Sequence, residues 1–204
     1  MTNQFWTNPY YFLGPIRFFF RKRRLRGFKA QYAHCRIIAD IGGDPSIWDV
    51  IGRTTGVAIV NVWVPDNRGT LPFILGDGCC LPFGDRSIDL AFSNSAIEHV
   101  GDFAHQTKFA EEMLRVGKKV YCQTPCRWFP IDPHLSAFFL HWLPRGWLTP
   151  AVLRYFTLNG WLSGRSYEYD VTWLSKSQLR RIFPECSIKT ERFFGWPKSF
   201  IITS

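Results

Sequence analysis

The chain has 204 residues and suits one domain around a single core, because cores divide only beyond about 250–300 residues. Its net charge of +9 would indicate a polyanion partner if the cations were spread along the chain. They are not: residues 1–39 hold eight Lys and Arg and no Asp or Glu, which leaves +1 for the remainder. The near-neutral remainder argues against nucleic acid as a partner.

The first segment, residues 1–35, is basic and aromatic and is interrupted by Pro9 and Pro15, and we expect a helical arm. Residues 17–29 mix phenylalanines with cations, a pattern typical of peripheral contact with an anionic membrane. The alternative is a solvated helix that packs Phe18, Phe19 and Leu25 on the domain. The apolar residues precede the charges, so no secretory signal is expected.

Six cysteines occur without the spacing of a disulfide framework or a zinc site. We therefore expect reduced, mostly buried thiols in a cytoplasmic protein, and the sequence assigns no metal site. The cysteines are Cys35, Cys79, Cys80, Cys122, Cys126 and Cys186.

Short apolar runs bounded by turn residues then alternate with helical segments, which predicts a parallel sheet that binds ligands at the carboxyl ends of its strands. The expected strands are residues 36–40, 57–63, 72–75, 88–93 and 119–123. Residues 103–116 show helical spacing, with Phe109, Met113 and Val116 on one side.

Prolines and aromatic residues dominate the segment that follows, and we expect a helical cap insert over the cleft at about residues 125–170. It contains no apolar run of the roughly 20 residues that a membrane helix needs. Residues 175–183 then predict a helix capped by Ser175, and residues 187–194 and 199–203 predict two closing strands.

The first strand runs into Asp40-Ile41-Gly42-Gly43-Asp44-Pro45-Ser46. Glycine lets the backbone turn sharply and lets a ligand lie against the amide groups. Polar residues follow the next strands at matching places, namely Asn61, Asp77 and then Glu98-His99-Val100.

With these residues, the chain resembles the class I S-adenosylmethionine-dependent methyltransferases, in particular the small-molecule, type 11-like group, closely over residues 36–126 and more loosely to Ser204. The resemblance implies a Rossmann-like three-layer α/β sandwich. Its sheet would be mostly parallel and seven-stranded, with an antiparallel C-terminal edge, and residues 36–204 would form the methyltransferase domain. In the family's loop, the second and third glycines fall here on Asp44 and Ser46.

The resemblance also implies S-adenosylmethionine as the cofactor. Asp40 would contact its amino group or order the loop, Asn61 would bind the ribose without charge assistance, and Asp77 would accept from the adenine amine. The full set of expected cofactor-binding residues is Asp40, Gly42, Gly43, Asp44, Asn61, Asp77, Gly78 and Asn94. Asp89 lies at the other end of its strand, and we interpret it as structural.

Two histidines are candidates for the catalytic base, because the unperturbed pKa of histidine lies near neutrality. His134 follows the fifth strand in a proline-stiffened loop, and Asp132 could orient its ring. We prefer His134 to His99 as the substrate-facing base, and a structural role is the alternative for His99.

These residues predict methyl transfer to a small-molecule, glycan or lipid-linked acceptor, with oxygen favoured by the two histidines. One alternative is a cofactor-free binding or scaffold protein, in which Asp44 repels the cofactor's carboxylate. Another is a nucleic-acid methyltransferase that uses the basic arm, for which binding would fall steeply with salt.

Overall fold

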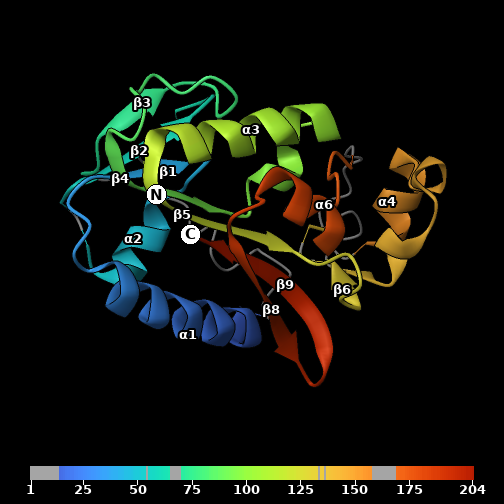
Figure 1. Ribbon diagram of the computed structural model, residues 1–204. Helices are drawn as coiled ribbons and strands as arrows, with labels where there is room; N and C mark the ends of the chain where they lie inside the picture. The colour runs from blue at the N-terminus through green and yellow to red at the C-terminus, as the bar shows by residue number, and fades with distance from the viewer. Residues whose placement is uncertain (1–13, 54, 65–69, 133, 136, 158–168) are drawn as a thin grey trace.

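The computed structural model describes residues 14–53, 55–64, 70–132, 134–135, 137–157 and 169–204. Seven strands form one sheet in the order β3-β2-β1-β4-β5-β9-β8 (Figure 1). β1 to β5 pair in parallel, whereas β9 pairs antiparallel with β5 and with β8, as the sequence predicted. The strands are β1 (Ile38–Ile41), β2 (Val57–Asn61), β3 (Phe73–Leu75), β4 (Ile88–Asn94), β5 (Gly117–Pro125), β8 (Ser187–Phe193) and β9 (Trp196–Thr203).

Helices cover both faces of this sheet, which gives three layers (Figure 1). α1 (Gly14–Tyr32) and α2 (Pro45–Ile51) lie on one face, and α3 (Phe103–Val116) and α6 (Lys176–Ile182) lie on the other. Ser175 caps α6 and forms a capping box with Gln178, so this helix begins where the sequence predicted. The α3 bounds also agree with the predicted helix.

The second half of α1 belongs to the core. Leu25, Phe28 and Tyr32 are buried, and Phe28 contacts Phe92 and Trp48 edge to face. Leu25 therefore packs on the domain, as one of the two interpretations of the arm expected. Residues 1–13 of that predicted arm, and the side chains of Phe18 and Phe19, lie outside the described part.

The opposite face buries aliphatic and sulfur-containing side chains beneath α3 and α6. Phe109 and Met113 of α3 and Leu179 of α6 are buried, as the helical spacing of residues 103–116 predicted for α3.

Asp89 lies at the amino end of β4 and accepts hydrogen bonds from the backbone amides of Arg36 and Ile37. These contacts agree with the predicted structural role of Asp89.

The insert after β5 is only partly helical. Its described residues form a two-stranded hairpin of β6 (Ile131–Asp132) and β7 (Ala137–Phe138), two short 3-10 turns, η3 (Leu140–Trp142) and η4 (Arg145–Trp147), and α4 (Pro150–Phe156). Leu135, Ala137, Leu148 and Leu153 form a small core of their own. The expectation of a helical cap was wrong for the hairpin, because closely spaced prolines prevent a continuous helix. Within the described residues, no helix is long and apolar enough to cross a bilayer.

Candidate functional site

A cavity of about 600 Å³ opens at the carboxyl ends of β1 to β4. Its walls come from residues 41–44, 60–63, 76–79 and 95–96, which follow or end those strands, and from α3 and the insert. This is the edge at which parallel α/β sheets bind ligands. The sequence predicted the same edge.

The loop after β1 depends on its two glycines. Gly42 has φ +71°, and a Cβ there would lie 2.5 Å from the Cβ of Ala96. A Cβ on Gly43 would instead collide with the carboxylate of Asp40, which lies beneath the loop. Both glycines line the cavity, and both are also required by packing inside the protein.

Asp40 itself does not line the cavity. Its side chain is fully buried, and Oδ2 accepts a hydrogen bond of 2.7 Å from the indole Nε1 of Trp48, whereas Oδ1 has no hydrogen-bond partner among the described residues. Burial raises the pKa of this carboxyl to about 7, against the opposing effect of the Trp48 bond. Asp40 is therefore not exposed to the cavity, where the predicted contact with the cofactor's amino group would need it. The alternative prediction, that Asp40 orders the loop, fits the geometry better.

Asp44 occupies the position of a family glycine and caps α2. Its Oδ1 accepts from the backbone amide of Ser46 at 2.8 Å. The turn is thus closed by a side-chain cap, with Pro45 in the first turn of the helix.

Asn61, Asp77 and Gly78 all line the cavity. Asn61 Oδ1 accepts from the amide of Val62, and its Nδ2 donates to the carbonyl of Gly43 at 3.3 Å. Asp77 Oδ1 accepts from the amide of Cys79 and so orders its own turn. These three predicted residues are brought together with Gly42, Gly43 and Asp44 around one space.

Asn94 is not part of that space. Its Oδ1 accepts from Nη2 of Arg24, a residue of α1 whose Nη1 pairs with Glu191 of β8. The prediction placed Asn94 at the cofactor because it ends β4, but its contact with α1 lies elsewhere. Ser95 and Ala96, which come next, line the cavity instead.

The cavity wall is acidic. Three carboxylates line it, those of Asp44, Asp77 and Asp170, and among the described residues no Lys or Arg does. Its only potentially cationic groups in the described part are the imidazoles of His99 and His105. The wall therefore favours a ligand with net positive charge.

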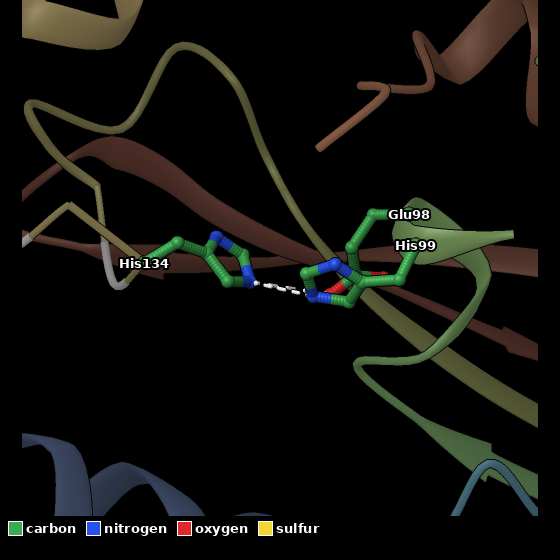
Figure 2. A group of neighbouring side chains, drawn as sticks. All are labelled: Glu98, His99 and His134. Atoms are coloured by element: carbon green, nitrogen blue, oxygen red, sulfur yellow. Dashed lines mark hydrogen bonds and ion pairs between the residues drawn. The ribbon is translucent and has the colours of Figure 1, made fainter. Parts of the chain in front are cut away.

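The two predicted catalytic histidines lie together at the end of this cavity. Nε2 of His99, in the 3-10 helix η2 (Ile97–His99), lies 3.2 Å from Nε2 of His134, which follows β6. Figure 2 shows the two rings pointing toward one another from separate segments, with the carboxylate of Glu98 next to them. His99 lines the cavity and His134 does not, which reverses the predicted preference for His134 as the substrate-facing ring.

A carboxylate faces Nδ1 of each of the two rings. Asp132 Oδ1 lies 3.1 Å from Nδ1 of His134, as predicted, and its Oδ2 accepts a 2.5 Å hydrogen bond from the hydroxyl of Tyr169. Asp170 Oδ1 lies 3.5 Å from Nδ1 of His99. Burial alone would raise the pKa of Asp132, but the hydrogen bonds from His134 and Tyr169 outweigh burial and hold it below its ordinary value.

Glu98 lies beneath the two rings and is fully buried. Oε2 accepts from the hydroxyl of Thr124 at 2.9 Å, whereas Oε1 has no hydrogen-bond donor within the described part of the chain and lies 3.9 Å from Nε2 of His134. Burial raises the pKa of Glu98 to about 7, and burial together with the neighbouring His134 lowers the pKa of His99.

Several residues of the site were not predicted. Glu98 was noted in the sequence beside His99 but received no role, and its adjacency was the only available signal. For Tyr169 and Asp170 the sequence offered no signal, because they lie at the end of the insert and meet the histidines only through the fold.

Comparisons with known proteins agree with this architecture. A family model described as "Methyltransferase domain" matches residues 50–120. No curated protein sequence matches the chain.

Solved structures with the same fold include the PH0226 protein of Pyrococcus horikoshii, at 13% identity and a TM-score of 0.57, covering 91% of this chain and 89% of that one. A SAM-dependent methyltransferase of Methanosarcina mazei is 16% identical, with a TM-score of 0.52 and coverages of 81% and 90%. Magnesium protoporphyrin IX methyltransferase of Synechocystis is 11% identical, with a TM-score of 0.52 and coverages of 89% and 81%. The chain thus has a methyltransferase-domain match over residues 50–120 and the fold of solved S-adenosylmethionine-dependent methyltransferases.

Proposed function

We propose that this chain transfers a methyl group from S-adenosylmethionine to an oxygen of a small-molecule, glycan or lipid-linked acceptor. The observation that carries the choice of oxygen is the His99–His134 pair at the end of the cavity, with a carboxylate behind each ring. A hydroxyl acceptor must lose a proton during transfer, and an imidazole is the side chain suited to accept it near neutral pH.

The cavity residues fit the cofactor in size and charge. A volume of about 600 Å³ lies within the range of small-molecule sites. S-adenosylmethionine carries a sulfonium, an ammonium and one carboxylate, and its net positive charge suits a wall that holds Asp44, Asp77 and Asp170. Asn61 and Asp77 would hold the ribose and the adenine, and the loop at Gly42 and Gly43 would lie against the remainder.

Bound there, S-adenosylmethionine supplies a methyl group already activated by its sulfonium. The chain's own residues then have two tasks, to align the acceptor oxygen and to remove its proton. His99 reaches the cavity and takes the proton on its imidazole, whose Nδ1 faces Asp170 and whose Nε2 faces His134. His134, held through Nδ1 by Asp132, positions His99 through the contact between the two Nε2 atoms.

Glycan and lipid-linked acceptors are supported by two observations outside the cavity. A structural relative, the N-terminal domain of EvdMO1, was crystallised in the presence of SAH and D-fucose, with a TM-score of 0.54 and 13% identity. On this chain, the insert exposes Trp128, Phe138 and Trp147, apolar side chains that suit an acceptor with a lipid part.

A lipid-linked acceptor would bring the basic helix to the membrane. Arg23, Arg26 and Lys29 of α1 are exposed, and each cation near an anionic surface contributes about 1 kcal/mol to binding. Co-sedimentation with vesicles of phosphatidylserine and phosphatidylcholine should fall when these three residues are changed to Gln. Equal sedimentation of the two proteins would remove the membrane part of the proposal.

The methyl-transfer proposal is tested in two steps. Isothermal titration should show binding of S-adenosylmethionine and of its demethylated product, with the cationic S-adenosylmethionine preferred because the wall is acidic. Transfer of labelled methyl groups is then measured on matched hydroxyl and amine acceptors. Absence of binding of both ligands at millimolar concentration would overturn methyl transfer itself, and transfer to amines alone would overturn the assignment to oxygen.

A further inference from the structure

The cluster of Glu98, His99 and His134 offers one ligand atom from each residue, all within 4.8 Å of one another. We propose that these three residues bind a divalent transition-metal ion. Metal binding goes beyond methyl transfer and does not depend on it, because the ligand set stands without cofactor or acceptor. The sequence did not predict this metal site, because the expectation concerned only the cysteines, whose spacing fits no zinc site.

The first argument is the direction of the lone pairs. Each ring has a carboxylate oxygen facing Nδ1, Asp132 for His134 and Asp170 for His99. A carboxylate there favours the tautomer with its proton on Nδ1 and leaves Nε2 as an acceptor. The two Nε2 atoms would then face one another at 3.2 Å with lone pairs only, which is unfavourable unless a proton or a metal ion lies between them.

The second argument is the buried carboxylate. Oε1 of Glu98 accepts no hydrogen bond from any described residue, although the side chain is fully buried and its other oxygen is satisfied by Thr124. A buried acceptor atom without a partner is energetically unfavourable. It lies 3.9 Å from Nε2 of His134, on the side where the two rings meet. A metal ion at that point would be the missing partner.

The distances agree with coordination. Two nitrogens each about 2.0–2.1 Å from a tetrahedral zinc ion lie about 3.4 Å apart, and about 3.0 Å apart at right angles. The observed 3.2 Å falls between these values. The Glu98 oxygen lies 3.9 Å from Nε2 of His134, within a set whose ligand atoms span up to 4.8 Å, and would have to move closer to complete the same sphere.

The donor set selects the class of ion. Two imidazoles and one carboxylate suit zinc, ferrous iron or cobalt, whereas magnesium and calcium prefer oxygen ligands. The carboxylates behind the rings provide the outer contacts usual for metal-bound histidines, and Tyr169 and Trp173 extend the network behind Asp132. Three protein ligands leave coordination positions open, and His99 lines the cavity. With the ion bound, Nε2 of His99 is a ligand, so the ion in place of His99 would promote loss of the proton from an acceptor oxygen.

The test is a titration of the chelator-treated full chain with Zn²⁺ and with Co²⁺, without cofactor. We expect one equivalent to bind, with a cobalt spectrum that lacks the near-ultraviolet thiolate band and so excludes the cysteines. Millimolar Mg²⁺ should not compete. His99→Ala, His134→Ala and the isosteric Glu98→Gln should each weaken affinity at least about 10-fold, and Asp132→Asn about 10- to 100-fold.

His105→Ala is the matched control, because His105 lines the same cavity but its Nδ1 contacts Asp102. It should leave the affinity unchanged. Circular dichroism identifies any variant that does not fold, and the remaining ligand variants then decide. No saturable binding, a thiolate spectrum, or affinity unchanged in folded His99→Ala and His134→Ala would overturn the metal site. Titration with S-adenosylmethionine on the same preparations tests methyl transfer separately, so either proposal can fail alone.

Discussion

Two aspartates at opposite ends of the parallel strands have opposite environments. Asp89, at the amino end of β4, accepts from two backbone amides and from Lys118, and the Lys118 bond, followed by the amides, lowers its pKa to about 2. Asp40, in β1 and buried beneath the cavity loop, accepts from Trp48, and burial raises its pKa to about 7. The comparison teaches that Asp89 at the amino end is satisfied within the fold, whereas at the carboxyl end Asp40 Oδ1 and Glu98 Oε1 have no hydrogen-bond partner among the residues that the structure describes.

The largest expected effect at the carboxyl end is on catalysis. His99→Ala should lower the rate of methyl transfer to a hydroxyl acceptor by about 10²- to 10⁴-fold, the usual contribution of a positioned acid or base. Steady-state kinetics measures the loss, and titration with S-adenosylmethionine should show that cofactor affinity is kept. If the variant's rate lay within twofold of the parent's, His99 at the carboxyl end of the sheet would not be the catalytic base.

The next effect concerns the cavity loop. Gly42→Ala adds a Cβ at φ +71° and within 2.5 Å of Ala96, and should lower the free energy of unfolding by about 2–4 kcal/mol. Gly27→Ala is the control, because Gly27 lies within α1 and a Cβ there meets nothing within 4 Å. It should stabilise by about 0.5–1 kcal/mol. Denaturant unfolding distinguishes the two, and equal effects would contradict the special role of the loop.

Asp40→Asn should change how stability depends on pH at the carboxyl end. The folded-state pKa of Asp40 is raised, so the wild-type protein loses stability as pH rises from about 4 through about 7. The variant has no charge to bury and should lose about 1–3 kcal/mol less over that range. Melting temperatures between pH 5 and 8 measure the difference, and parallel curves would contradict it.

Asp89→Asn should give the smallest effect, with the opposite sign of pH dependence. The folded-state pKa of Asp89 is lowered, so its stabilisation is present above about pH 4 and is lost as pH falls toward 2. The variant should melt below the wild type at pH 6, and the gap should narrow as pH falls from about 4 toward 2. A constant gap across this range would show that the exposed pair with Lys118 contributes nothing through its charge.

Periodic elements of the fold were predictable from the sequence. Residues 103–116 gave the bounds of α3 because its apolar residues recur at helical spacing, and Ser175 was recognisable as a cap by its position before the last helix. The insert was not predictable to the same degree, because its aromatics and prolines follow neither helical nor strand spacing.

The site residues, like the elements of the fold, were predictable only in part. Glycines and acids after each strand indicated the cavity, since the ends of parallel strands meet at one edge. The contact between His99 and His134 depends on how the insert folds back, and Asp170 arrives from still further along the chain. Asn94 was misplaced because sequence order cannot tell which face a strand's last side chain reaches.

The packing of α1 decides how its charges can be studied. Leu25, Phe28 and Tyr32 fill the sheet's aromatic face, and Arg24 joins the end of β4 to the edge strand β8. Deleting the N-terminal 30 residues would therefore remove a wall of the domain along with its basic surface. The exposed cations have to be neutralised one by one on an intact helix, so that a loss of membrane contact is not mistaken for a loss of structure.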